Sequence, residues 1–179
     1  KKAKLFRASN DFSQIKNTDL IIVCVPTPLT KFREPDLSPI LDTAKTISRY
    51  LKKGQLIILE SSTYPGTTNE KLANVLALSG LKKNKDFYLA YSPEREDPGN
   101  KYFNTSTIPK IVGADTTKEL NLAVAVYSGV IKSVIPVKGT RTAEAAKLTE
   151  NIFRSVNIAL VNELKVIFDA MEIDVWDVI

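Results

Sequence analysis

The sequence predicts an α/β fold in which a mainly parallel sheet is followed by one long helix. Two observations carry this prediction. Short apolar runs rich in β-branched residues alternate with stretches of helical periodicity, a pattern typical of strands joined by crossover helices. Residues 140–171 then contain no Gly or Pro, and roughly 30 residues at 1.5 Å each predict a helix about 45 Å long.

The first segments predict one strand and its approach. We interpret residues 1–9 as a short strand or the approach to one, and the polar residues 11–17 as a helix. Residues 19–25 (DLIIVCV) form a continuous apolar run, the pattern of a strand that is buried on both faces. Pro26 and Pro28 end this strand, because proline lacks the N–H that a strand needs.

The next segments predict a second buried strand between two helices. A helix is expected over residues 38–51, followed by a strand over residues 55–60 (QLIILE). Pro65 and Gly66 then open a helix over residues 67–78, since proline is tolerated in the first turn of a helix.

The third part of the chain predicts three more strands around one helix. The strands are expected over residues 87–91, 110–113 and 133–137, and the helix over residues 118–127. The polar residues 97–107 between the first two of these strands are expected to form an ordered loop.

The long helix has an apolar stripe and a plausible start. Thr140 is a candidate N-cap with Gly139 before it, and residues 173–179 resemble the start of another helix. We place a domain boundary here, with a sheet domain at residues 1–138 and a connecting helix at residues 139–179. Apolar residues on more than one face indicate burial: Leu148, Ile152, Phe153, Val156, Ala159, Leu160, Val161, Leu164, Ile167, Phe168 and Met171.

Composition limits the possible functions. The 179 residues are 44% hydrophobic and 25% charged, as in ordinary globular proteins, and no apolar run is long enough to span a membrane. The single cysteine, Cys24, is interpreted as a small core residue, which indicates no disulfide framework and a reducing, cytoplasmic setting.

Charge and histidine content exclude further classes. The absence of histidine removes the commonest metal ligand and general base, and we expect no metal site. The net charge of +5 is compatible with a phosphate-bearing ligand. No run of four Lys or Arg occurs, and aromatic residues are not interleaved with basic ones, which argues against a nucleic-acid module.

Polar residues gather at two kinds of position. Lys147, Asn151 and Arg154 share one face of the long helix, where a cation and an amide suit an anion or a developing oxyanion, although a solvated flank is the simpler alternative. The segments VPTP, ESSTYPGTT and SPERE each follow a predicted strand. Ligands of open α/β sheets bind at such strand ends, and a nicotinamide cofactor is the usual one, but the fingerprint GxGxxG is absent from this sequence.

Five segments together resemble the UDP-glucose/GDP-mannose dehydrogenase family. They are CVPTP, ESSTYPGTT, YSPEREDPGN, IPKIVG and AEAAKLTENIFRSVNIALVNEL, and they cover nearly the whole chain in this order. PEREDPGN is most similar to the UDP-N-acetylglucosamine 6-dehydrogenases. The resemblance implies a Rossmann-type NAD-binding domain, of which residues 1–138 are the C-terminal part, then a central dimerisation helix and the start of the middle domain.

The same resemblance implies a reaction. Such enzymes use two NAD to oxidise the C6 hydroxyl of a UDP-sugar to a carboxylate, and here a UDP-N-acetylhexosamine is expected, for surface polysaccharide precursors. The chain is then expected to be a fragment, inactive alone, that lacks the glycine-rich turn and the segment with the catalytic cysteine. Cys24 does not match that cysteine.

Site residues are assigned by the same resemblance. Thr63 is expected to orient a water, Glu94 to act as general acid and base, and Lys147 with Asn151 to stabilise the oxyanion at C6. A turn hydroxyl for Thr63 and a strand-end ion pair for Glu94 remain alternatives. The expected cofactor contacts are Val25, Pro26, Thr27, Pro28, Ser62 and Thr63, and the expected substrate contacts are Glu94, Arg95, Glu96, Lys147, Asn151 and Arg154.

Other functions remain open at this point. A second enzyme reading is another Rossmann-type dehydrogenase, of the hydroxyacid or 6-phosphogluconate group, which also has a long helix after the nucleotide domain. A non-enzyme reading is a binding or dimerisation module. The long helix with its several apolar faces predicts a homodimer, and nucleic acid and membranes are not expected as partners.

Overall fold

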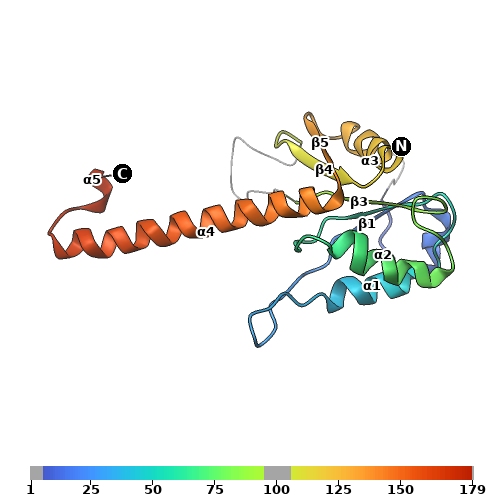
Figure 1. Cartoon of the computed structure of the whole chain (residues 1–179), viewed down its shortest axis with the longest axis horizontal. Coiled ribbons are helices and arrows are strands. Elements are labelled where there is room, and N and C mark those ends of the chain that lie inside the picture. Colours follow the sequence, from blue (N-terminus) through green and yellow to red (C-terminus); the bar gives the residue numbers. More distant parts are fainter. Residues whose placement is uncertain (1–5, 95–105, 179) are drawn as a thin grey trace. The chain divides into compact units, whose positions relative to one another are not determined.

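The structure is a computed structural model that describes residues 6–94 and 106–178. In the described chain, strands alternate with helices in an α/β arrangement, and one very long helix, α4, follows them (Figure 1). It divides into two compact units, residues 1–145 and residues 146–179, which are described separately below.

The first unit is built on a five-stranded sheet with the order β1-β2-β3-β4-β5. β1 pairs with β2, β2 with β3 and β4 with β5 in parallel, whereas β3 and β4 are antiparallel. The predicted, mainly parallel sheet is therefore confirmed, and the one antiparallel pairing was not predicted. The strands are β1 (Leu20–Val23), β2 (Leu56–Leu59), β3 (Tyr88–Tyr91), β4 (Lys110–Ala114) and β5 (Val134–Lys138).

Each predicted helix is present, with one difference in type. The segment predicted as a single helix after Gly66 consists of a π-helix, an α-helix and a 3-10 helix in succession. The helical elements are η1 (Phe12–Asn17), α1 (Ser38–Ser48), η2 (Thr67–Leu72), α2 (Ala73–Leu76), η3 (Ala77–Ser79), α3 (Thr117–Ser128), α4 (Thr140–Ala170) and α5 (Val175–Val178).

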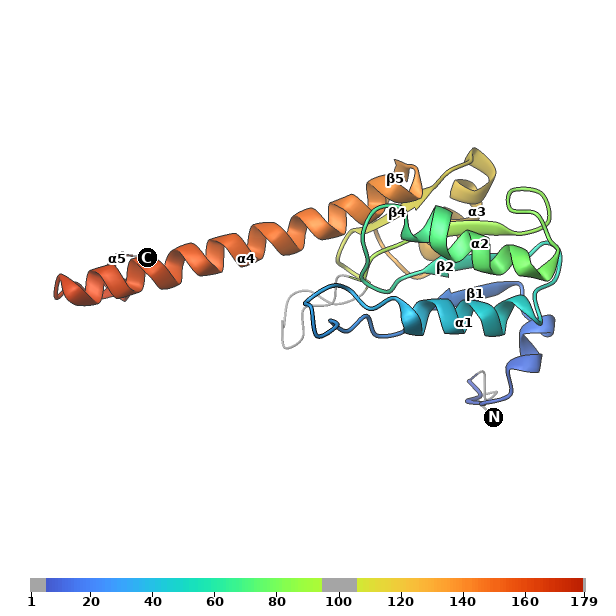
Figure 2. The same ribbon diagram turned by 60° about the horizontal axis from the view of Figure 1, so that its bottom comes forward.

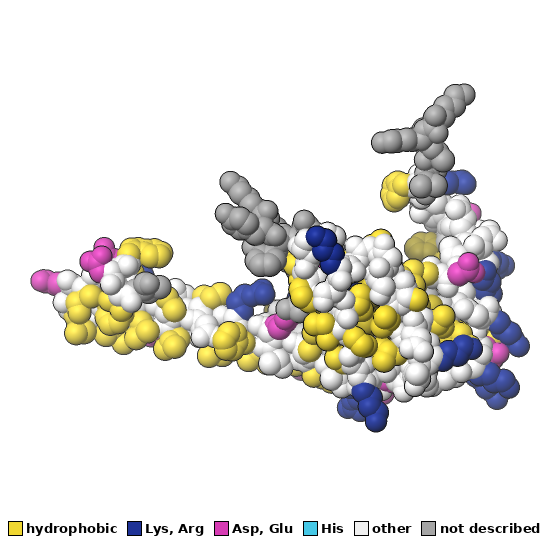
Figure 3. Space-filling model, turned by 90° about the horizontal axis from the view of Figure 1, so that it is seen from above, with side chains coloured by type: hydrophobic (Ala, Val, Ile, Leu, Met, Phe, Trp, Pro, Cys, Tyr) yellow, Lys and Arg dark blue, Asp and Glu magenta, His cyan; other side chains and the backbone are white. Residues whose placement is uncertain are grey.

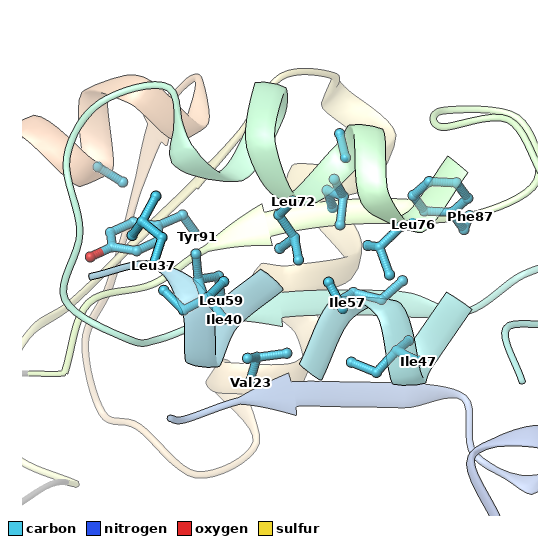
Figure 4. Packing of buried hydrophobic residues seen from close by; sticks show 14 residues of the cluster. Val23, Leu37, Ile40, Ile47, Ile57, Leu59, Leu72, Leu76, Phe87 and Tyr91 are labelled. Carbon is cyan, nitrogen blue, oxygen red and sulfur yellow. The ribbon is translucent and has the colours of Figure 1, made fainter. Parts of the chain in front are cut away.

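Helices cover both faces of the sheet. α1 and α2 lie on one face and α3 on the other (Figures 1 and 2). Along β2, Ile57 and Leu59 point into the core under α1 and α2, while Leu56 and Ile58 point into the core under α3. The first of these cores is shown in Figure 4. This alternation explains why β2 is apolar at every position.

The N-terminal part of the sheet differs from the prediction. Of residues 1–9, which were expected to form a short strand or the approach to one, residues 1–5 lie outside the described residues and residues 6–9 form no strand. Among the described residues, β1 is an edge strand of the sheet and Ile22 is 43% exposed, so burial of this strand on both faces is not found there. The reason is that Val23 packs into the core under α1, whereas no described helix covers the Ile22 side.

The start of α4 is fixed tightly to the sheet. A Cβ atom at Gly113 of β4 would lie 2.6 Å from the carbonyl oxygen of Gly139, so only glycine permits this approach. The cap of α4 is not Thr140 itself, because Thr140 is already helical. The carboxylate of Asp115 instead accepts hydrogen bonds from Thr140 N (3.0 Å) and Thr140 Oγ1 (3.2 Å).

The second unit consists of the rest of α4 and of α5. The apolar stripe of α4 is largely exposed within this chain, with Phe153 as much as 70% exposed, so its predicted burial is not found among the described residues. Figure 3 shows hydrophobic side chains along the surface of this unit. None of the helices in the described parts of the chain combines the length and apolar character that a membrane span requires.

Candidate functional site

The ends of three strands meet at one edge of the sheet. The parallel register aligns the last residues of β1, β2 and β3. The residues that follow, Cys24, Glu60 and Ser92, therefore leave the sheet side by side. An open depression of about 400 Å³ lies here, lined by Cys24, Glu60, Ser61, Ser62 and Glu94. Glu94 and Ser62, which sequence reasoning selected from two different segments, are thus brought together.

The antiparallel strand β4 adds a cation to this edge. Because β4 runs opposite to β3, its first residue, Lys110, lies where β3 ends. Lys110 Nζ is 3.1 Å from Glu60 Oε1, 3.4 Å from Glu94 Oε2 and 3.4 Å from the carbonyl oxygen of Pro93. It also lies 5.0 Å from the centre of the Tyr127 ring. The ammonium is therefore surrounded by oxygen atoms and one aromatic face.

Glu60 is the buried counter-charge of Lys110. The side chains of Lys110 and Glu60 are only 7% and 13% exposed, respectively. Glu60 also accepts a hydrogen bond from the hydroxyl of Tyr127 and one from Cys24 Sγ at 3.4 Å. Burial, and then the neighbouring Glu60 carboxylate, raise the pKa of Tyr127, so its hydroxyl remains a donor.

Cys24 differs from its predicted place in the core. The residue as a whole is exposed, because it follows β1 at the edge of the depression. Partial burial of the thiol and the nearby Glu60 carboxylate raise the pKa of Cys24 to about 11. A thiol with such a pKa stays protonated near neutral pH and is a poor nucleophile.

The segment after β1 supplies backbone and hydroxyl groups. Val25 N donates to Ser61 Oγ at 2.9 Å, which ties the ends of β1 and β2 together. Pro28 accepts a hydrogen bond from Asp36 N at 2.8 Å, and Pro26 is exposed. Thr27 Oγ1 is buried and has no hydrogen-bond partner among the described residues. A buried hydroxyl of this kind fits a contact with a polar ligand such as a dinucleotide.

Thr63 precedes a turn that accepts support from a buried carboxylate, that of Glu144. Thr63 Oγ1 donates to Thr67 Oγ1 at 2.5 Å. Glu144, near the start of α4, accepts hydrogen bonds from Gly66 N (2.7 Å), Thr68 N (2.8 Å) and Thr68 Oγ1 (2.7 Å). Burial raises the pKa of Glu144, although these hydrogen bonds oppose the shift. Gly66 has φ +101°, which this turn requires and glycine permits.

The remaining predicted residues lie elsewhere. Arg95 and Glu96 fall outside the described residues. Lys147, Asn151 and Arg154 belong to the second unit, where Lys147 is half-buried and the other two are exposed. The joint action of this helix group with Thr63 and Glu94 therefore stays a prediction. In the described parts of the chain, no group of three or more acidic, Cys or His side chains could hold a metal ion.

The sequence analysis did not select three charged residues that organise the strand-end edge and the turn after β2: Glu60, Lys110 and Glu144. A signal for each was present. Glu60 and Lys110 are charged residues at the ends of apolar runs, and Glu144 stands in an Ala-rich helix segment. A charged residue in such surroundings is rarely buried without a partner.

Two parts of the chain match two domain models of one protein family. Residues 1–131 match the NAD binding domain of the UDP-glucose/GDP-mannose dehydrogenase family, and residues 141–179 match the central domain of that family. The prediction of an NAD cofactor agrees with the domain that is matched.

Individual relatives are similar over nearly the whole chain. Protein CapL of Staphylococcus aureus is 41% identical over 173 residues, which are 96% of this chain and 41% of CapL. A UDP-N-acetyl-D-glucosamine 6-dehydrogenase of Salmonella typhi is 38% identical over 176 residues, 97% of this chain and 41% of that protein. The chain thus spans about two fifths of the length of these curated relatives.

Solved structures share the fold. A UDP-D-ManNAc dehydrogenase from Pyrococcus horikoshii has a TM-score of 0.89 and 37% identity, covering 96% of this chain and 41% of that chain. A GDP-mannose dehydrogenase from Pseudomonas aeruginosa, solved as a ternary complex, has a TM-score of 0.84 and 25% identity, covering 95% of this chain and 40% of that one.

Proposed function

The chain belongs to the UDP-glucose/GDP-mannose dehydrogenase family, and we propose that it works as part of an NAD-dependent nucleotide-sugar 6-dehydrogenase. The proposed reaction oxidises the C6 hydroxyl of a UDP-N-acetylhexosamine to a carboxylate, for surface polysaccharide precursors. The names of the Salmonella typhi and Pyrococcus horikoshii relatives support this substrate class. One observation carries the proposal: Glu94 and Ser62 meet at the strand-end edge of a domain of this family.

The residues at this edge fit a dinucleotide. Val25, Pro26, Thr27 and Pro28 on one side, and Ser62 and Thr63 on the other, would hold the cofactor, with the buried hydroxyl of Thr27 in need of a partner. NAD supplies the hydride acceptor when it is bound. We retain residues 1–138 as the proposed part of the NAD-binding domain and residues 139–179 as the proposed start of the central domain.

Each predicted site residue has a role in the proposed reaction. Thr63 donates its hydroxyl proton to Thr67, so its lone pairs are available to accept a hydrogen bond from a water. Glu94, which is 46% exposed, would take up or release a proton at that water. Lys147 and Asn151, one turn apart on α4, would donate an ammonium and an amide proton to the oxyanion at C6.

The proposed nucleophile is a cysteine outside this chain. Cys24 does not fit the role, since its thiol keeps its proton near neutral pH. In the proposal, C6 loses two hydrides, for which two NAD would be the acceptors. Loss of the first hydride leaves the aldehyde, to which the cysteine adds, and loss of the second leaves a thioester, which the water held by Thr63 and Glu94 hydrolyses. It follows that residues 1–179 alone form no NADH, and NADH formation by this chain alone would contradict this part.

Lys147→Ala in the full-length protein tests the proposed function. Losing one oxyanion donor typically lowers turnover by about 100-fold or more, and we expect that loss here. The measurement is NADH formation with UDP-N-acetylglucosamine and UDP-N-acetylmannosamine as substrates. Lys165→Ala on the same helix is the matched control and should leave turnover unchanged.

Two outcomes would contradict this proposal. Near-native turnover of Lys147→Ala would remove Lys147 from the mechanism. NADH formation with a hydroxyacid or 6-phosphogluconate, and none with any UDP-sugar, would favour a different Rossmann-type dehydrogenase.

We also propose a homodimer that forms through α4, in the cytoplasm. The support for the dimer is the exposed apolar surface of this helix, which includes Ile152, Val156 and Leu160. Exposed apolar surface of this extent commonly marks a protein interface, and two-fold pairing is the commonest arrangement. The single cysteine suits a reducing compartment.

A further inference from the structure

Lys110 is a buried cation that the proposed function does not yet use. Its side chain is 7% exposed, and burying an ammonium is unfavourable unless oxygen atoms replace water around it. Among the described residues, oxygens of Glu60, Glu94 and Pro93 do so, all within 3.4 Å of Nζ. An ammonium group has three protons to donate, so each of these oxygens can accept one of them.

The two carboxylates around Lys110 differ in exposure. Glu60 is 13% exposed and is held by the Tyr127 hydroxyl as well as by Lys110. Glu94 is 46% exposed and lines the depression at the strand ends. One side of the ammonium is thus fixed in the protein, and the other side contacts the carboxylate that faces the site.

We infer that Lys110 is a positioning residue that holds the Glu94 carboxylate in place for the proposed reaction. Lys110 is too buried to touch a substrate itself, so its effect must pass through Glu94. The antiparallel direction of β4 is what makes this possible, because it brings the first residue of β4 to the edge where β3 ends. This inference rests on the proposed function, in which Glu94 is the general acid and base.

Three variants of the full-length protein test this inference. Lys110→Met removes the charge and keeps most of the length of the side chain, and Lys110→Arg restores a cation. Lys118→Met is the matched control, since Lys118 also lies over a tyrosine ring, that of Tyr88 at 4.4 Å, but has no described contact with a carboxylate.

The expected kinetic result is a separation of kcat from KM. A misplaced acid–base group lowers turnover by about 10- to 100-fold, so we expect Lys110→Met to lower kcat by this amount. The KM for NAD and the KM for the UDP-sugar should each change less than about twofold. Lys110→Arg should restore at least about half of the decrease in log kcat that Lys110→Met causes. Lys118→Met should have the kcat of the unmodified protein. Circular dichroism checks that both Lys110 variants are folded. For folded variants, an unchanged kcat in Lys110→Met, or no recovery of kcat in Lys110→Arg, would overturn the inference.

Crystal structures of the same variants give a readout that does not need activity. In Lys110→Met, the Glu94 carboxylate should leave its position while Glu60 and Tyr127 stay, and Lys110→Arg should return it. If the unmodified protein forms no NADH with any UDP-N-acetylhexosamine, the proposed function fails, and the position of Glu94 in these structures still decides the role of Lys110. An unmoved Glu94 carboxylate in Lys110→Met would overturn that role.

Discussion

The carboxylate of Glu60 controls the chemistry of its neighbours at the strand-end edge. It accepts hydrogen bonds from Tyr127 and Cys24 and forms an ion pair with Lys110. Burial, and after it the negative charge of Glu60, raise the pKa values of Tyr127 and Cys24. Both effects favour the neutral forms of these two acids, whereas the charge of Lys110 opposes the shift at Cys24.

The reactivity of Cys24 follows from this arrangement. Because its pKa is about 11, we expect Cys24 to react with iodoacetamide at pH 8 at least about tenfold more slowly than N-acetylcysteine, since only the thiolate reacts. Cys24 is the single cysteine of the chain, so mass spectrometry of the alkylated chain measures this rate directly.

The control for Cys24 is Glu60→Gln. This variant removes the negative charge and should speed the alkylation severalfold. A rate for the unmodified chain equal to that of the free thiol would show that Glu60 does not protect the thiol.

Single residues of the site were predictable only where a motif named them. Ser62, Thr63 and Glu94 stand in recognisable segments, and the structure places Ser62 and Glu94 around one depression. Lys110 was not predicted, because its contact with Glu94 depends on the direction of β4. Alternating strands and helices indicate parallel pairing. The exception had one signal that was not used: residues 97–107, between the strands at 87–91 and 110–113, are expected to be a loop and not the crossover helix that parallel strands usually need.

At the scale of elements, η2 and the start of α4 are joined by one side chain. Glu144 of α4 accepts three hydrogen bonds from Gly66 and Thr68, at the start of η2. We expect Glu144→Ala to lower the free energy of unfolding by about 3 kcal/mol, because each buried donor left without a partner costs about 1–3 kcal/mol. Urea denaturation measures this loss, and Glu163→Ala on the exposed surface of α4 is the control.

The same carboxylate gives a pH dependence with a definite sign. The pKa of Glu144 is raised above 4.5 by burial, so the folded state binds its proton more tightly than the unfolded state. Protonated Glu144 therefore contributes to the free energy of unfolding below pH 4.5, and this contribution is lost as the pH rises through the raised pKa of Glu144. Glu144→Gln mimics the protonated form of Glu144 at every pH. The free energy of unfolding of this variant, relative to that of the unmodified chain, should therefore rise as the pH increases from 4.5 through the raised pKa of Glu144. A pH-independent difference between the two would contradict the raised pKa.

Most elements were predictable from the sequence, and the exceptions have physical causes. The buried strands β2 and β3 and the helix α4 follow from long, unambiguous patterns. The burial of β1 was overestimated for the described chain, because an apolar run does not reveal that its strand lies at an edge of the described sheet. The cap of α4 was assigned to Thr140, because the actual cap, Asp115, lies far away in the sequence.

At the scale of the whole molecule, the two units differ in how they are stabilised. Both hydrophobic clusters lie within the first unit, and their last member is Ala143. In the described part of the second unit, Val175 is the one buried hydrophobic residue, whereas Ile152, Phe153 and Ile167 are more than half exposed. The first unit therefore has its own core, whereas the apolar side chains of α4 in the second unit are largely exposed within the described chain.

This contrast makes truncation a test of both units. We expect residues 1–145 to keep a melting temperature within about 4 °C of that of the whole chain, because truncation removes none of the core and about 1 kcal/mol shifts a domain of this size by that amount. We also expect them to sediment as a monomer, whereas residues 1–179 associate through α4.

Residues 1–142 are the matched control, since they lack Ala143 and Glu144. Their free energy of unfolding should fall by about 3 kcal/mol because of the unpaired donors at Gly66 and Thr68. If residues 1–145 were as unstable as residues 1–142, the rest of α4 would have to stabilise the sheet. If residues 1–179 remained monomeric at high concentration, the exposed apolar surface of α4 would not be a dimer interface.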